Sequence, residues 1–173
     1  MESLSSTLKE LEDFLRQSNS PLLERLLPGT DLSKIEGPND LFRKQDVRDL
    51  YAWKNGVDCG ELTIGELLLF QNGIMLPAEE ACQEYDIAQE EELWEGNLFP
   101  LFSNGGGDFL LYDTNTSIGI YYYAPVIVEG TPKVYEDLTT MMKTVLECYK
   151  QKSYYWTDGT LKIDYEIFVC INL

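Results

Sequence analysis

The sequence predicts an α+β fold in which a central, mostly antiparallel β-sheet is flanked by helices. Leucines recur at helical spacing near the N-terminus, short β-rich segments separated by turns occupy residues 98–135, and another helical pattern follows them. Helices, then a cluster of strands, then a helix are the order typical of α+β domains. Because 173 residues are enough for one core and few for two, we expect a single domain over 1–173.

The N-terminal third is predicted to be helical. The first helix carries its apolar side chains on one face: Leu4, Leu8, Leu11, Phe14 and Leu15. Thr7 and Glu10 have the spacing of a capping box. Ser20-Pro21 indicates the start of a second helix, which stops before Pro28-Gly29.

A third helix is expected after the turn at residues 37–40. Its apolar face contains Leu41, Phe42, Val47, Leu50 and Tyr51. It ends at Asn55-Gly56, where a left-handed backbone conformation costs little. The apolar residues 64–70 that follow are expected to be buried.

A fourth helix is predicted to begin at Leu76-Pro77. Proline favours the first helical position, and Glu79 and Glu80 suit the positive end of the helix dipole. This helix runs into three consecutive glutamates, Glu90 to Glu92.

The next segments are predicted strands. Residues 98–102 and 109–112 pair as a hairpin through the glycine-rich turn, and 118–123 and 133–135 add further strands. A last amphipathic helix starts at Asp137 and runs to Tyr149. The tail is open to two interpretations: period-two alternation over 161–171 favours a strand, whereas Phe168 and Cys170 allow a short buried helix.

Composition disfavours several functions. With 13 basic and 30 acidic residues the net charge is −17, which argues against nucleic acid and anionic membranes as partners. Histidine is absent, which excludes a Ser-His-Asp triad, a Cys-His pair and a histidine zinc site. The four cysteines show no C-x-x-C spacing, which excludes zinc-finger and thioredoxin sites. A disulfide framework is an alternative, but a core of this size does not require one, so we expect free, mostly buried thiols in a reducing compartment. We expect a cytoplasmic protein without a signal peptide, a spanning segment or a cofactor.

The negative charge is concentrated in the middle of the chain. Residues 55–132 contain 14 acidic residues and no lysine or arginine. Ordinary surfaces intersperse both signs of charge. One interpretation is a solvated surface that maintains solubility. The other is a docking surface for a basic partner, because a field of one sign accelerates association.

Local motifs in this stretch favour structure over catalysis. Gly105-Gly106-Gly107-Asp108 precedes a strand and has no lysine nearby, so a hairpin turn is favoured over a phosphate cradle. Asp108 and Asp113 would be the acids of an enzyme, but turn formation explains both. We therefore predict no catalytic, metal-binding or cofactor-binding residues.

The candidate partner-binding residues are acidic or aromatic. Tyrosine and tryptophan commonly anchor interfaces, and Tyr122 must point to the sheet face opposite to Tyr121 and Tyr123. The candidates are Glu79, Glu80, Glu84, Asp86, Glu90, Glu91, Glu92, Trp94, Glu95, Asp108, Tyr121, Tyr122 and Tyr123.

Four segments in order carry a family resemblance. They are the helix at 46–56, which ends in Tyr-Ala-Trp-Lys-Asn-Gly, the strand-to-helix segment at 69–81, residues 94–113 with a proline-containing strand, a glycine turn and a strand ending in Asp, and the closing helix at 138–149. Together they resemble the SUKH superfamily, the Smi/Knr-type domain, over about residues 40–150. The resemblance implies structural roles for Tyr51, Trp53, Asn55, Gly56, Pro100, Gly105, Gly106, Gly107 and Asp113.

The resemblance also implies an α+β domain without catalytic apparatus. Its core is expected at about 36–150, with N-terminal helices in 1–35 and a C-terminal extension in 151–173. Many bacterial members are immunity proteins that neutralise toxins, often nucleases, and others are intracellular interaction modules. We therefore expect an immunity protein that binds a basic toxin domain. The alternative is an interaction or regulatory scaffold of the same fold without a toxin partner.

Overall fold

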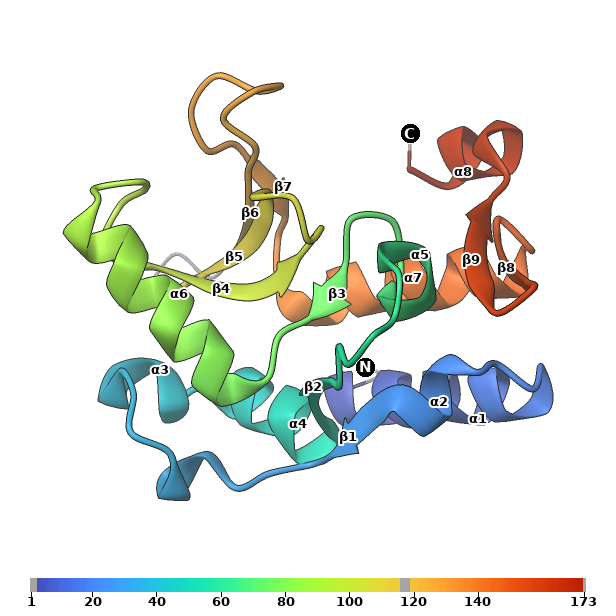
Figure 1. The fold of residues 1–173 in the computed structure, drawn as a ribbon, viewed down its shortest axis with the longest axis horizontal. Helices are drawn as coiled ribbons and strands as arrows, with labels where there is room; N and C mark the ends of the chain where they lie inside the picture. The colour runs from blue at the N-terminus through green and yellow to red at the C-terminus, as the bar shows by residue number, and fades with distance from the viewer. Residues whose placement is uncertain (1–2, 116–118, 173) are drawn as a thin grey trace.

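The computed structural model describes residues 3–115 and 119–172, and its centre is a five-stranded antiparallel sheet (Figure 1). The strand order is β3-β4-β5-β6-β7. These strands are β3 (Ile74–Met75), β4 (Leu98–Ser103), β5 (Phe109–Asp113), β6 (Ile120–Tyr123) and β7 (Lys133–Tyr135). Two smaller two-stranded sheets pair β1 (Leu26–Pro28) with β2 (Lys54–Val57), and β8 (Tyr154–Thr157) with β9 (Thr160–Ile163).

Helices flank the sheet, which confirms the predicted α+β class. They are α1 (Leu4–Gln17), α2 (Leu22–Arg25), a 3-10 helix (Leu32–Lys34), α3 (Asn39–Phe42), α4 (Gln45–Trp53), α5 (Ile64–Leu67), α6 (Ala78–Glu90), α7 (Leu138–Lys150) and α8 (Tyr165–Asn172). No helix in the described part of the chain is long and apolar enough to cross a membrane.

The N-terminal helix belongs to the same hydrophobic core as the sheet. Helix α1 packs against α4 and α7, and its predicted apolar face is buried at four positions: Leu4, Leu8, Leu11 and Leu15. The predicted capping box at Thr7 and Glu10 is wrong. The Ser3 side chain caps the helix by accepting a hydrogen bond from the Ser6 N–H, which brings Leu4 into the apolar face.

Two of the predicted helices are shorter than expected. Helix α2 ends at Arg25 because the next residues form β1, in which Leu26 lies opposite Val57 of β2. The predicted third helix is divided into α3 and α4. Residues 64–70 contain the short helix α5, and Ile64 is 50% exposed, so the expectation that this segment is buried throughout is wrong.

The predicted hairpin of β4 and β5 is confirmed. Pro100 lies opposite Leu111, and the register shifts between Pro100 and Phe102, a bulge that suits a residue without an N–H to donate. Gly105 and Gly107 supply the positive φ angles of the turn, 76° and 99°. The predicted strand at 118–123 begins at Ile120; residue 118 lies outside the described residues.

The C-terminal tail contains both of the predicted alternatives. Its first part is strand β9, which pairs with β8, and its second part is helix α8. In Figure 1 this hairpin and α8 stand at one end of α7, across from the loop that joins β6 to β7. The expectation of mostly buried thiols is wrong for the described cysteines: Cys148 is buried, but Cys82 is half-buried and Cys59 is exposed. The side chain of Cys170 lies outside the described residues.

Candidate functional site

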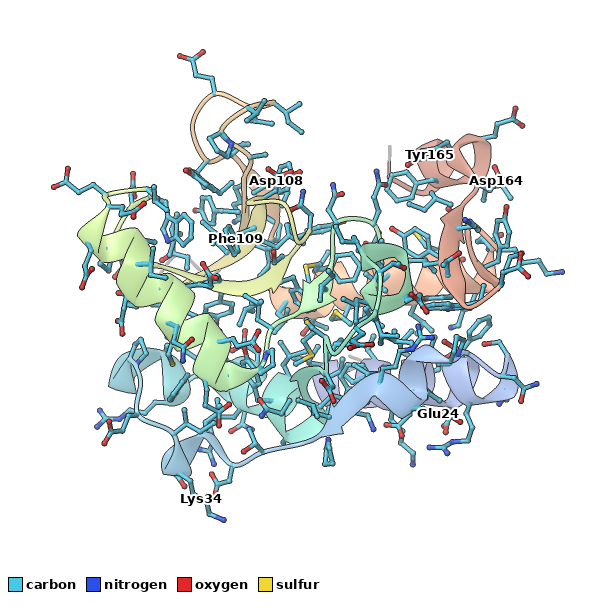
Figure 2. The ribbon with its side chains drawn as sticks, in the orientation of Figure 1. Glu24, Lys34, Asp108, Phe109, Asp164 and Tyr165 are labelled. Atoms are coloured by element: carbon cyan, nitrogen blue, oxygen red, sulfur yellow. The ribbon has the colours of Figure 1, made fainter. Side chains whose placement is uncertain are left out.

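Most of the acidic residues of the cation-free stretch lie on one helix and the loop that follows it. Eight of its 14 carboxylates belong to α6 and the loop that follows it, and all are exposed except the half-buried Glu84. In Figure 2, side chains extend outward along the length of α6. We call this group the acidic surface: Glu79, Glu80, Glu84, Asp86, Glu90, Glu91, Glu92 and Glu95.

The motif at 51–56 holds the start of α6. The Asn55 side-chain oxygen accepts a hydrogen bond from the Ala78 N–H at 2.9 Å. A Cβ atom on Gly56 would lie 2.2 Å from the Pro77 nitrogen, and Gly56 has a φ of +79°. The buried Tyr51 hydroxyl donates to the Leu76 carbonyl at 3.3 Å. The Asn-Gly pair therefore does more than follow the end of α4: it caps one helix and admits the close approach of another segment.

The inner side of α6 is built for close packing against β4. Ala78, Ala81 and Ala88 are buried, and such small side chains let the helix approach the sheet. Tyr85 fastens the C-terminal half: its hydroxyl donates to the Gly96 carbonyl at 2.6 Å, and its ring lies 5.4 Å from that of Phe99. These contacts hold α6, which carries five of the eight carboxylates, against the sheet.

The charge arrangement on α6 is unfavourable for the isolated domain. The helix has no basic residue in its last turn, which contains Glu90 and is followed by Glu91 and Glu92. The partial negative charge of a helix C-terminus repels such carboxylates. Partial desolvation, together with the neighbouring Glu84 and Glu79, raises the pKa of Glu80, although the residue is exposed. Among the described residues, ion pairs are made by Glu10, Glu12, Glu66 and Glu136, and by no member of the acidic surface.

A thiol beneath the acidic surface is kept protonated. Burial, reinforced by Asp86 and Glu79, raises the pKa of Cys82 to about 11. The thiol is therefore the dominant form near neutral pH, and Cys82 is not an activated nucleophile. The chemistry that this surface offers is the attraction of positive charge.

The structure separates the aromatic candidates from the acids. Trp94 is only 8% exposed, because its ring packs against Phe109 and Tyr123 and its N–H donates to the Leu98 carbonyl. Trp94 therefore attaches the loop that follows α6 to the sheet. Tyr121 and Tyr123 are half-buried and lie on one sheet face, and the half-buried Tyr122 lies on the other, as alternation predicts.

Asp108 and Asp113 each organise their own turn. Asp108 is 9% exposed and accepts hydrogen bonds from the Asn104 amide and the Tyr122 hydroxyl. Asp113 accepts from the Asn97 amide and the Asn115 N–H. Among the described residues, no group of three His, Cys, Asp or Glu side chains is arranged to hold a metal ion.

The remaining motif residues also have local contacts. The Trp53 indole N–H donates to Glu12 at 2.9 Å and so joins α4 to α1. In the glycine turn, the Gly106 N–H donates to the Asn104 side chain at 2.7 Å.

Two apolar residues of the acidic surface region were not among the sequence candidates. Ile87 is 45% exposed and Leu93 is 36% exposed. The signal for Ile87 is its phase: on α6 it falls outside the buried stripe that contains Ala81 and Ala88. Apolar side chains among carboxylates are suited to the centre of a protein interface.

No protein-family model matches this sequence, and no curated protein matches it. The SUKH-like interpretation therefore stays a prediction based on the order of its motifs.

Proposed function

We propose that this chain is a non-catalytic protein-binding domain, an immunity protein of the SUKH type that binds and neutralises a basic, nuclease-type toxin domain. The observation that carries the proposal is the acidic surface: eight carboxylates on one helix and its following loop, none in an ion pair with a described residue of the chain itself. A nuclease domain needs a cationic substrate-binding surface, which is the complementary charge.

Steering and contact are supplied by different side chains. The carboxylates accelerate encounter with a cationic surface, since single-sign fields raise association rates. Ile87 and Leu93 supply exposed apolar area within the same region. The hydrogen bonds of Asn55 and Tyr85 already hold α6 in place in the free protein. Binding therefore loses less conformational entropy than it would with a mobile helix.

The acids at the end of α6 also suggest selection for binding. Glu90 to Glu92 oppose the helix dipole in the free protein, and a partner cation would relieve that repulsion. Stability sacrificed at an exposed site is typical of functional surfaces.

The first test asks whether a nuclease-type toxin domain is encoded beside the gene for this chain, and measures association with an inactive form of that domain. We expect the association rate to fall about tenfold as ionic strength rises from about 0.05 M to about 0.5 M, because the Debye length shortens to a few ångströms. An association rate that does not change with salt contradicts steering by the acidic surface.

The second test separates the acidic surface from net charge. The triple variant Glu90→Gln, Glu91→Gln, Glu92→Gln is compared with Asp58→Asn, Glu61→Gln, Glu129→Gln, which removes the same charge from exposed acids elsewhere in the cation-free stretch. Only the first should slow association and weaken inhibition of the active nuclease. Equal effects would assign the attraction to overall charge. Failure to bind the toxin, with salt-dependent binding of another cellular protein, would favour the scaffold alternative.

A further inference from the structure

A second candidate site lies away from α6, on the other side of the sheet from Trp94. A cavity of about 230 Å³ opens between the sheet, α7 and the C-terminal hairpin with α8. Five aromatic side chains contribute to its lining: Phe70, Tyr122, Tyr135, Tyr154 and Phe168. None of the described residues that line it carries a charge.

A buried hydrogen-bond acceptor in the lining lacks a partner. Gln71 lines the cavity, and its side-chain oxygen Oε1 is buried without a hydrogen bond to any described residue. Leaving such a group unsatisfied is costly, and native structures rarely retain one without a reason. For this oxygen to reach a donor in the cavity, the Gln71 amide must turn toward it. The missing partner is an N–H or O–H group.

One aromatic wall of the cavity is coupled to a negative charge. The Tyr122 hydroxyl donates to the Asp108 carboxylate at 3.1 Å, and the Asn104 amide donates to the same oxygen at 2.7 Å. Burial and this carboxylate raise the pKa of Tyr122. A phenol that donates to a carboxylate has an electron-rich ring, which strengthens its attraction for a cation.

We propose that this cavity binds the guanidinium group of an arginine side chain presented by a basic polypeptide. A guanidinium is planar and weakly hydrated, stacks on aromatic rings and carries several N–H donors, one of which would satisfy Gln71. An ammonium group is more strongly hydrated and fits this lining less well. The net charge of −17 favours a cationic occupant over a neutral one. The inference goes beyond the proposed toxin inhibition, since it requires only a chain that contains arginine.

The test titrates the full chain with blocked arginine (N-acetyl-arginine-N-methylamide) and with its neutral counterpart, blocked citrulline, while NMR follows the tyrosine ring signals and the Gln71 side-chain amide. Arginine should bind about fivefold or more tightly than citrulline, because only the guanidinium is charged. Shifts should be centred on Tyr122, Tyr135 and Gln71. Equal binding of citrulline, no shift at the cavity, or shifts confined to α6 would each overturn the proposal.

Two variants at Gln71 should change the affinity for arginine in opposite directions. Gln71→Glu should tighten binding of arginine but not of citrulline, and Gln71→Leu should weaken binding of arginine. Gln83→Leu, an exposed position on α6, is the matched control and should leave the affinity unchanged. Thermal unfolding shows that each variant is folded, and the Gln71→Leu chain should melt at a higher temperature because it removes the unpaired acceptor. If Gln71→Leu binds arginine as the wild type does, Gln71 is not the acceptor and the proposal fails.

The two proposals fail separately. The triple glutamine variant at residues 90–92 should keep the arginine affinity of the cavity. If the chain binds blocked arginine but no nuclease-type toxin domain, the proposal of an arginine-binding cavity stands and the proposal of an immunity protein fails.

Discussion

The glutamates of α1 and those of α6 are the same chemical group in opposite situations. Glu12, 23% exposed, accepts hydrogen bonds from Arg16 at 2.9 Å and from the Trp53 indole at 2.9 Å, and it pairs with Lys54 at 3.5 Å. Glu10 pairs with Lys150 at 2.6 Å and links α1 to α7. By contrast, the acidic surface makes no ion pair with any described cation of the chain.

The same contrast appears at the helix ends. Helix α1 has Arg16 in its last turn, and α7 has Lys150, so both place positive charge at the negative end of the dipole. Helix α6 ends in glutamates. The difference indicates that charges in α1 and α7 hold the fold together, whereas those on α6 are retained at some cost to it.

The largest expected effect tests the structural side of this comparison. Glu12→Ala should lower the free energy of unfolding by about 2 kcal/mol, because it removes hydrogen bonds to charged groups and leaves the half-buried Trp53 N–H without its acceptor. Urea denaturation measures the loss. Asp13→Ala, at the next and exposed position of α1, is the control and should change stability by a few tenths of a kcal/mol at most. Similar losses in both variants would mean that Glu12 is not a structural link.

The second prediction concerns how the acidic helix is held. Asn55→Ala should cost about 1 kcal/mol, because the Ala78 N–H at the start of α6 loses its side-chain acceptor. Asn55→Asp keeps an acceptor and should recover part of the loss, with a remainder from repulsion by the nearby Glu79. Urea denaturation of the three chains gives the order wild type, Asp, Ala. If Asp and Ala lose the same amount, the cap does not position α6.

Local signals in the sequence predicted the elements that depend on local chemistry. Pro77 followed by two glutamates marks the start of α6, and the glycine turn joins β4 to β5. The pairing of β1 with β2 was missed because Leu26 and Val57 are far apart in sequence. Nearby leucines favour a helix for residues 22–27 until that distant partner is known.

The candidate site also contains features that neighbouring residues predict and features that depend on segments distant in sequence. The acids were predicted as a group because they share one helix and its following loop, which expose them. Trp94 was a partner-binding candidate, whereas the structure covers its ring with Phe109 and Tyr123, which come from strands distant in sequence. The cavity beside Gln71 was missed for the same reason: its lining comes from segments that only the tertiary fold brings together.

The third prediction tests the cost of the acidic surface. The triple variant Glu90→Gln, Glu91→Gln, Glu92→Gln should raise the free energy of unfolding by about 0.5 to 1 kcal/mol at low ionic strength, because it removes negative charge from the helix C-terminus. The gain should shrink in about 1 M salt. The control is the triple variant at Asp58, Glu61 and Glu129. A variant less stable than wild type would mean that these acids make stabilising contacts within the fold.

The smallest expected effect is a change in stability that has opposite signs when Glu80 and Glu66 are each replaced by glutamine. Partial desolvation and the nearby Glu84 and Glu79 raise the pKa of Glu80 above its ordinary value of 4.5, so the native state binds that proton more tightly than the unfolded state does. Glu80→Gln should therefore be more stable than wild type near neutral pH, and the difference should disappear as pH falls through the raised pKa to below 4.5. Hydrogen bonds from Thr63, with a smaller contribution from Arg25, lower the pKa of Glu66.

Glu66→Gln should behave in the opposite way. Its charged form is favoured in the native state, so the variant should be less stable than wild type above 4.5, and the difference should vanish as pH falls through the lowered pKa. Thermal unfolding across this pH range compares both variants with wild type. If the two curves deviate from wild type in the same direction, the distinction between paired and unpaired carboxylates does not hold, because both groups would then respond to the total charge of the chain rather than to their own contacts.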